Sequence, residues 1–346
     1  MEVFVPKVSL VIPVCNVERY LDECLDSVEA QTLEDIEVIC VNDGSTDSSA
    51  EILRRHAQRD SRIRLVDKPN AGYGHTINLG ISLATGEYLG ILESDDFAES
   101  DMLQRLYEVA ESKRLDVVRA NYWLYWSSPE PRNEFVEFCQ QEHCGSVFSP
   151  REYIEPFFFP PALWSMLVRR ELIAKNGLRL LETPGASFQD TSFSFKIWSV
   201  AKRAMLLHEA FLHYRQDNEA SSINNKSKAY YVCDEYAEVE RFVRDDVSDL
   251  SLMSIAQRRK YDAYVWNLGR IAPSLRVEFA RRASGEFSDA MERGWLRDAP
   301  LTKSQRRSIQ VLIERPEIFV SRFNEGASPA YPAFVSKLLG RMRGGC

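Results

Sequence analysis

The chain has 346 residues, enough to bury one large hydrophobic core or two ordinary ones. Its net charge of −8 disfavours a nucleic-acid partner, and no apolar run is long enough for a transmembrane helix. The N-terminus lacks a basic stretch followed by an apolar core, so we expect no secretory signal and a cytoplasmic location. Cys139 and Cys144 are close enough in sequence to pair, but free thiols are the expected state in a reducing cytoplasm.

Strands and helices alternate through the first 125 residues. The apolar runs that predict strands lie at 8–12, 36–41, 63–66, 88–92 and 117–120, and Pro13 is expected to end the first of them. Helical periodicity predicts one helix after Asn16 as its N-cap, one that ends near Asp60, and two more at 71–84 and 101–113. This order implies an α/β fold with a Rossmann-like, mostly parallel sheet flanked by helices.

Two common phosphate-binding fingerprints are missing from this α/β pattern. Neither Gly-x-Gly-x-x-Gly after the first strand nor a loop that ends in Gly-Lys-Ser/Thr is present. A hydride-transfer enzyme and a phosphate-loop NTPase are therefore disfavoured. A nucleotide whose diphosphate is held by a metal ion on carboxylates remains consistent with the pattern.

Glu93-Ser94-Asp95-Asp96 follows the buried strand at 88–92 directly. Carboxylates so close together repel one another, and their oxygen atoms suit Mg²⁺ or Mn²⁺. Open α/β sheets bind ligands at the carboxyl ends of their strands, where this segment lies. The alternative is an acidic loop that only caps the next helix.

Four segments in this order resemble the family 2 glycosyltransferases. They lie at 8–18, 41–47, 70–81 and 93–96, and the last matches the family's Asp-x-Asp-Asp element with Glu93 at its first position. The resemblance implies a glycosyltransferase A-type fold, a nucleotide-activated sugar as donor, and Mn²⁺ or Mg²⁺ as cofactor.

The resemblance also implies roles for individual residues. Asp43 takes the place of the carboxylate that pairs with the base, usually uracil, and Asp95 and Asp96 take the place of the metal-binding pair. Alternatives are that Pro13 only ends a strand and that Asp43 is only a turn residue. The residues implied to contact the donor are Pro13, Asn16, Glu18, Asp43, Lys68, Asn70, Gly72, Ser94 and Asp95.

A second chemical centre is predicted around Asp190, before a helical stretch. Asp190 is either a helix N-cap or, by the resemblance, the catalytic base. Gln189 replaces the family's usual Glu and, with Trp164, is assigned to acceptor binding, because sugars stack on aromatic faces. His213, on a predicted edge strand at 205–214, is a candidate third metal ligand, and Arg215 is a candidate phosphate partner.

The composition changes near residue 226. Residues 1–225 are predicted to form the catalytic nucleotide-sugar-binding domain, and 226–346 a helical C-terminal region that packs on it. Alternative roles for the helical region are homodimerisation and peripheral membrane contact, because residues 303–346 are basic and end in an amphipathic stretch.

The resemblance implies an inverting, metal-dependent transfer from a nucleoside diphosphate sugar, with a UDP-sugar favoured, to a hydroxyl of a glycan or glycolipid acceptor. Bacterial cell-surface polysaccharide synthesis on the cytoplasmic side of a membrane is the setting it suggests. Alternatives are a nucleotidyltransferase and a non-catalytic partner that only binds a sugar nucleotide. Asp96 and Asp190 disfavour the non-catalytic alternative, because a sensor needs no base.

Overall fold

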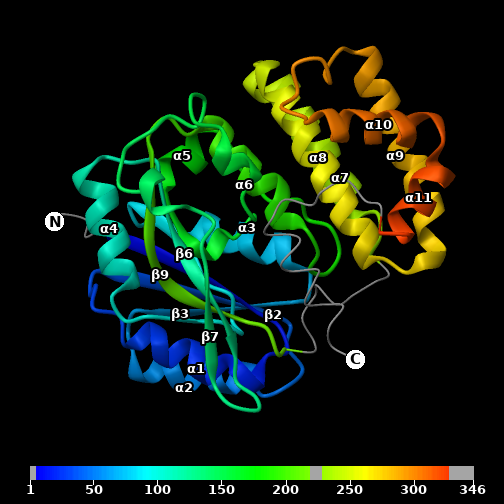
Figure 1. Cartoon of the computed structure of the whole chain (residues 1–346). Coiled ribbons are helices and arrows are strands. Elements are labelled where there is room, and N and C mark those ends of the chain that lie inside the picture. The colour runs from blue at the N-terminus through cyan, green and yellow to red at the C-terminus, as the bar shows by residue number, and fades with distance from the viewer. Residues whose placement is uncertain (1–4, 219–227, 327–346) are drawn as a thin grey trace. The chain divides into compact units, whose positions relative to one another are not determined.

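The computed structural model describes residues 5–218 and 228–326 (Figure 1). The chain divides into two compact units, residues 1–221 and 222–346, and each is described by itself.

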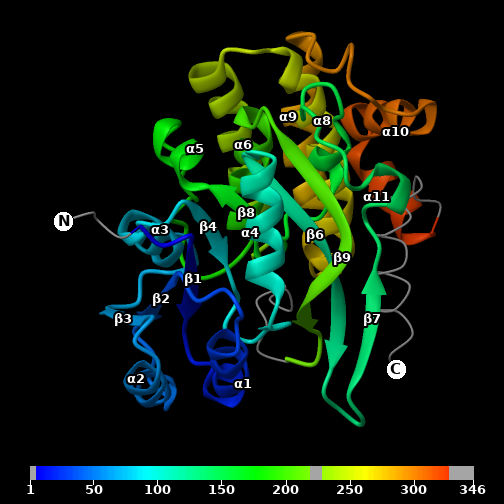
Figure 2. The same cartoon turned by 90° about the vertical axis from the view of Figure 1, so that its left-hand side faces the viewer.

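A single sheet forms the centre of the first unit. Its strands run in the order β3-β2-β1-β4-β8-β6-β9-β5, and β7 pairs with β6 (Figure 2). Strands β1, β2, β3 and β4 all run parallel to one another. Strand β8 runs antiparallel to both of its neighbours, β4 and β6. The strands are β1 Val8–Val14, β2 Ile36–Asp43, β3 Ile63–Lys68, β4 Tyr88–Ile91, β5 Phe97–Ala98, β6 Val117–Trp126, β7 Arg132–Val136, β8 Met166–Arg169 and β9 Ala204–Arg215.

Helices cover both faces of this sheet, as the sequence predicts. Figure 1 shows α1 and α2 on one face and α3 on the other. Leu10 and Ile12 of β1 share one buried cluster with apolar residues of α1, α2 and α4, while Val11 points towards α3. The α-helices of this unit are α1 Glu18–Glu29, α2 Ser49–Arg59, α3 Tyr73–Leu83, α4 Met102–Ser112, α5 Arg170–Lys175 and α6 Gln189–Val200. Short 3₁₀ turns are η1 Gln141–His143, η2 Glu155–Phe158 and η3 Leu163–Ser165.

Several predicted boundaries are wrong. β1 continues through Pro13, which pairs with Val41 of β2. The pairing of β1 with β4 ends earlier, at Val11, so no strand on that side needs an N–H from Pro13. Asn16 does not cap α1, whose N-cap is Val17. The predicted edge strand at 205–214 lies between β6 and β5 instead. Strand β8 was not foreseen, because four residues carry too short a pattern to distinguish a strand from a loop.

Helices make up the second unit. They are α7 Tyr231–Arg241, α8 Ser251–Arg270, α9 Arg276–Glu292, α10 Lys303–Glu314 and α11 Pro316–Asn324, with a π-helical turn η5 at Phe242–Val247 and a 3₁₀ turn η6 at Pro273–Leu275. The ammonium group of Lys260 lies 2.9 Å from carboxylates of Glu240 and Glu286, and it links α7, α8 and α9 inside this unit. Among the described residues, no helix combines the length and apolar composition that crossing a membrane requires. The amphipathic stretch expected at the basic C-terminus lies outside the described residues.

Two helical glycines offer a test of this packing. A Cβ atom at Gly80 of α3 would lie 2.3 Å from Cγ1 of Val11, whereas a Cβ atom at Gly285 of α9 would meet nothing within 4 Å. We expect Gly80→Ala to destabilise the protein by about 1–3 kcal/mol through overpacking. Gly285→Ala should stabilise it by about 0.5–1 kcal/mol, because alanine loses less conformational entropy in a helix. Thermal unfolding of both variants measures the signs, and stabilisation by both would contradict the packing of α3 on β1.

Candidate active site

The acidic segment leaves the sheet at the carboxyl end of β4. Residues 92–96 form a short turn before β5, closed by a 3.1 Å hydrogen bond from the N–H of Asp96 to the carbonyl of Glu93. Asp96 is 1% exposed and Ser94 is also buried. The turn therefore brings the side chains of Glu93, Asp95 and Asp96 together under poor solvation, where their negative charges disfavour one another.

Asp96 is only partly satisfied. Its Oδ1 accepts a 2.8 Å hydrogen bond from the backbone N–H of Arg215, while its buried Oδ2 has no hydrogen-bond partner in the described part of the chain. Burial, followed by the charge of Asp95, raises the pKa of Asp96 well above its ordinary value. A cation beside Oδ2 would relieve both effects.

Arg215 supports the acidic turn from within the protein. Its guanidinium donates from Nε to the carbonyl of Asp95 at 2.8 Å and pairs with Glu23 of α1. The rings of Tyr20 and Tyr125 lie 4.7 and 4.9 Å from the guanidinium carbon. The side chain is buried, so this arginine, which the sequence suggested as a phosphate partner, contributes its positive charge beneath the turn.

Glu93 is held by a residue that the sequence analysis did not assign to the site. The hydroxyl of Tyr73, the first residue of α3, donates a 2.6 Å hydrogen bond to Oε1 of Glu93. Burial, with the charges of Asp95 and Asp190, raises the pKa of Glu93 to about 8, although the Tyr73 hydrogen bond acts in the opposite direction. The only signal for Tyr73 in the sequence was its place directly after Gly72.

Asp190 acts electrostatically on the acidic turn, although the two lie far apart in the sequence. It is the second residue of α6, whose N-cap is Phe188, so Asp190 is not the cap itself. Its charge is the smallest of the causes that raise the pKa of Glu93, after burial and the charge of Asp95. Tyr214 of β9 also has its pKa raised well above the ordinary value, first by burial and then by the charges of Asp96, Asp95 and Asp190. The charge of Asp190 thus influences groups in and around the acidic turn.

The loop before α6 is fixed by close contact with the start of α3. The N–H of Tyr73 donates to the carbonyl of Gly185 at 3.0 Å, and a Cβ atom at Gly72 would lie 2.8 Å from the nitrogen of Gly185. Gly72 has a φ of 90°, which an L side chain rarely adopts. Gln189, predicted to contact an acceptor, is buried and donates to Oγ1 of Thr183 at 2.8 Å and to the carbonyl of Gly185 at 3.1 Å. Gly72 and Gln189 therefore hold the loop that leads into α6 and Asp190.

Asp43 ends β2 and organises the neighbouring segment 68–72. Its carboxylate accepts hydrogen bonds from the N–H groups of Ala71 at 2.7 Å and Gly72 at 3.0 Å, and it pairs with the ammonium group of Lys68. Asn70 donates to the carbonyl of Asp43 at 2.9 Å and is itself exposed. The carboxyl ends of β2 and β3 are thereby joined by a buried ion pair and its hydrogen bonds.

The loop after β1 joins the same edge. Asn16 has a φ of 51°, and its Oδ1 accepts a 2.8 Å hydrogen bond from the N–H of Thr46. Glu18 accepts a 2.8 Å hydrogen bond from the N–H of Ser48 near the start of α2. Pro13 is buried in β1 beneath this loop. The residues predicted to contact the nucleoside therefore line the carboxyl ends of β1, β2 and β3.

Trp164 and His213, predicted to contact the acceptor and the metal ion, are both packed among aromatic side chains. Trp164 is 9% exposed, and its ring packs 4.5 Å from Tyr122 and 5.1 Å from Tyr214, centroid to centroid. His213 stacks on Phe97, and its ring nitrogens lie 2.9 Å from Oδ1 of Asn133 and 2.9 Å from Oε1 of Glu99. Both nitrogens are thus already engaged, and the structure does not direct them to Asp95 or Asp96.

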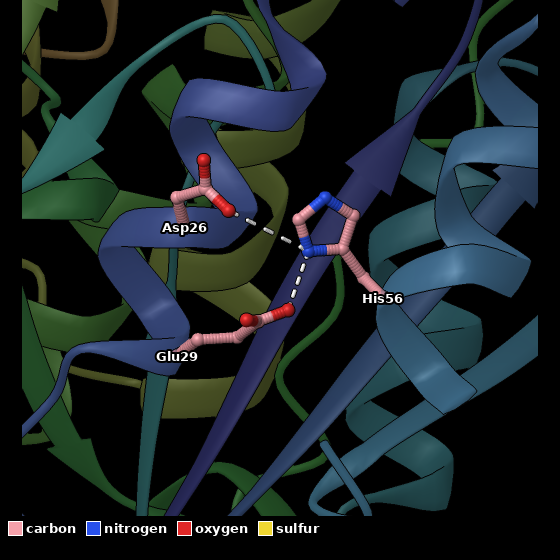
Figure 3. A group of neighbouring side chains, drawn as sticks. All are labelled: Asp26, Glu29 and His56. Atoms are coloured by element: carbon pink, nitrogen blue, oxygen red, sulfur yellow. Dashed lines mark hydrogen bonds and ion pairs between the residues drawn. The ribbon is translucent and has the colours of Figure 1, made fainter. Parts of the chain in front are cut away.

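Elsewhere in the described residues, three potential metal ligands meet between α1 and α2: Asp26, Glu29 and His56 (Figure 3). A guanidinium nitrogen of Arg59 lies 2.7 Å from Nδ1 of His56 and 3.1 Å from a carboxylate oxygen of both Asp26 and Glu29. The position that a metal ion would take is therefore filled by a cationic side chain. This cluster is an ion-pair network that joins two helices.

Comparison with known proteins identifies relatives of this chain. The model of the family described as Glycosyl transferase family 2 matches residues 9–138. GlyG of Streptococcus pneumoniae, named a glycosyltransferase, is 31% identical over 218 residues, which cover 60% of this chain and 70% of GlyG. EpsJ of Bacillus subtilis, described as an uncharacterized glycosyltransferase, is 36% identical over 219 residues, which cover 62% of either chain. The chain thus spans less than two thirds of the length of EpsJ.

Solved structures share the fold. TarS of S. aureus, crystallised in complex with UDP-GlcNAc, superposes with a TM-score of 0.61 at 15% identity and covers 92% of both chains. The Pyrobaculum calidifontis mannosyltransferase PcManGT, in complex with GDP-Man and Mn²⁺, gives a TM-score of 0.50 at 17% identity and covers 94% of this chain and 88% of that one. The protein belongs to the family 2 glycosyltransferases, and the predicted glycosyltransferase A-type fold is confirmed.

The raised pKa of Glu93 predicts how stability depends on pH in the metal-free protein. The pKa of Glu93 is about 4.3 in the unfolded chain and about 8 in the folded protein. Between these two pH values the folded state binds more protons than the unfolded state, so the free energy of unfolding falls as pH rises. We expect Glu93→Gln to melt at a higher temperature than wild type near pH 8, with the difference shrinking towards pH 5. Thermal unfolding in EDTA measures this, with Glu111→Gln, at an exposed glutamate of α4, as the matched control. A difference that is constant with pH would contradict the burial of Glu93.

Proposed function

We propose that this protein transfers a sugar from a nucleoside diphosphate sugar, with a UDP-sugar first among candidates, to a hydroxyl of a glycan or glycolipid. The transfer inverts the anomeric carbon. The observation that supports the proposal is the electrostatic influence of Asp190 on Glu93 of the acidic turn after β4, because the proposed base and the proposed metal-binding carboxylates would have to act at one reaction site. A protein that only binds a sugar nucleotide has no need of that base.

The donor subsite is assigned to the carboxyl edge of β1 to β3 and the acidic turn. The polar loops after β1 and β2 and the segment 68–72 present exposed backbone and side-chain groups there, including Asn16 and Asn70. We assign Asp43 to the base, Lys68 and Gly72 to the base and diphosphate, and Ser94 and Asp95 to the donor beside the metal. TarS and PcManGT, which share the fold, were solved with UDP-GlcNAc and GDP-Man respectively.

The residues present fit a divalent cation, Mn²⁺ or Mg²⁺. Asp95 and Asp96 offer hard carboxylate oxygens, and Oδ2 of Asp96 is buried without a partner in the described residues. When bound there, the ion would offset the negative charge of the diphosphate leaving group. His213 fits this role poorly, because Asn133 and Glu99 hold its two ring nitrogens.

Asp190 is assigned as the general base. Its carboxylate accepts the proton of the acceptor hydroxyl while the acceptor oxygen attacks the anomeric carbon and the bond from that carbon to the diphosphate oxygen breaks. Attack opposite the leaving group inverts the carbon and needs no covalent sugar–enzyme intermediate.

The acceptor subsite is assigned to the surroundings of Asp190, with Gln189 and Trp164 as its proposed residues. Trp164 packs against Tyr214, whose pKa is raised by burial and then by acidic charges that include Asp96 and Asp190, so we assign Trp164 to support of this subsite. Gln189 acts by fixing the loop ahead of Asp190. A glycan of cell-surface polysaccharide synthesis, made on the cytoplasmic face of a membrane, is the proposed setting.

Turnover of purified protein tests the proposal. In a panel of UDP-, GDP- and dTDP-sugars with Mn²⁺, we expect one donor to release nucleotide, and we expect Asp190→Asn to lower its turnover by about 10²–10⁴-fold. Asp101→Asn, at an exposed aspartate before α4, is the matched control and should leave turnover unchanged.

Donor affinity distinguishes loss of the base from loss of the site. Asp190→Asn should bind the donor nucleotide as wild type does, since the proposed donor subsite lies on other residues. Wild-type turnover in Asp190→Asn would overturn the assignment of the base. Release of pyrophosphate from a sugar phosphate and a nucleoside triphosphate would instead identify a nucleotidyltransferase.

A further inference from the structure

The segment that follows β7 carries two cysteine thiols in contact. Sγ of Cys139 and Sγ of Cys144 lie 2.8 Å apart on either side of the 3₁₀ turn η1. Cys139 is 2% exposed, whereas Cys144 is half-buried and reachable from solvent. A disulfide requires an S–S distance of about 2.05 Å, so only a small movement separates this contact from a bond.

The backbone on both sides of the pair is anchored to the sheet. Oδ1 of Asn121, in β6, accepts from the N–H groups of Phe138 at 3.2 Å and Cys139 at 3.3 Å. The N–H of Gly145 donates to the carbonyl of Leu206, in β9, at 2.9 Å. The two thiols are therefore held together by the fold and do not depend on a chance loop conformation.

The remaining cysteines of the described residues have different surroundings. Cys24, Cys40 and Cys233 are buried, so a dissolved oxidant does not reach them. Cys15 is exposed, and its sulfur contacts Asn70 and the carbonyl of Asp43. The pair of Cys139 and Cys144 alone in this set combines an accessible thiol with a second thiol in contact with it.

We propose that Cys139 and Cys144 form a redox modification site, at which a small-molecule disulfide such as glutathione disulfide converts the two thiols into an intrachain disulfide. Cys144 loses its proton to solvent, attacks one sulfur of the oxidant and expels a thiolate, which leaves a mixed disulfide on Cys144. The deprotonated sulfur of Cys139 then attacks Sγ of Cys144 and expels the second thiolate. Two protons and two electrons leave the protein, and the oxidant is reduced to two thiols.

The local chemistry sets the conditions for this reaction. Burial raises the pKa of both Cys139 and Cys144, so the thiolate population is small near neutral pH and grows as pH rises. The bond would close a short ring over η1 next to Phe138, whose ring lies 5.1 Å from that of Phe159. Oxidation would thereby add a covalent link to a segment that hydrogen bonds already anchor to β6 and β9.

Peptide mapping of the full-length wild-type protein tests the proposal. Reduced protein is treated with glutathione disulfide, its free thiols are blocked with N-ethylmaleimide, and it is digested without reductant. We expect a linked peptide that joins Cys139 to Cys144, formed faster at higher pH and absent from the untreated protein. A glutathione adduct on Cys144 as the end product, or a link from either residue to another cysteine, would overturn the proposal.

Two variants give the matched controls. In Cys139→Ala, the resolving thiol is gone, so glutathione should accumulate on Cys144 as a stable mixed disulfide. In Cys144→Ala, Cys139 should stay unmodified because it is buried. Rapid glutathione attachment to Cys139 in Cys144→Ala would show that the proposed order of attack is wrong. The peptide map of the wild-type protein tests the disulfide even if one of the variants fails to fold.

Discussion

Repulsion among poorly solvated carboxylates is the constraint on which the first unit of this protein depends. Glu93, Asp95 and Asp96 leave β4 within one turn, and the charge of Asp190 also acts on Glu93. Placing such groups out of water costs free energy unless cations, hydrogen bonds or protons compensate. The raised pKa values of Glu93 and Asp96 show that the protein alone compensates them incompletely. A site of this kind favours a ligand that brings positive charge.

The fold supplies the remaining compensation from rigid elements. Arg215, at the end of β9, reaches beneath the acidic turn, and Tyr73, at the start of α3, donates to Glu93. The loop before α6 lies directly on the backbone at Gly72, where no side chain would fit. Because strands and helix ends hold these groups, the carboxylates keep a fixed geometry before any ligand binds, as catalysis requires.

Much of the site could be predicted from the sequence because its parts occupy strand ends. Apolar runs identified β1 to β4, and polar residues directly after them, such as Asp43 and Asp95, must meet at one edge of a parallel sheet. Contacts between distant segments left no such pattern. Nothing in the sequence shows that Tyr73 bonds to Glu93 or that Asn133 and Glu99 engage His213. The boundary predicted at Pro13 is wrong because it also depends on a contact between distant segments. A proline ends a strand only where a neighbouring strand needs its N–H, and the sequence does not show which strands are neighbours.

The central claim is that the acidic turn binds the diphosphate of a nucleotide through a divalent cation. Calorimetric titration of UDP into the purified protein, with Mn²⁺ and then in EDTA, tests it most directly, and Asp96→Asn serves as the variant. We expect binding that requires Mn²⁺ and is lost in Asp96→Asn, with GDP as the second nucleotide tried if UDP does not bind. Equal affinity with and without the metal, or unchanged affinity in Asp96→Asn, would contradict it.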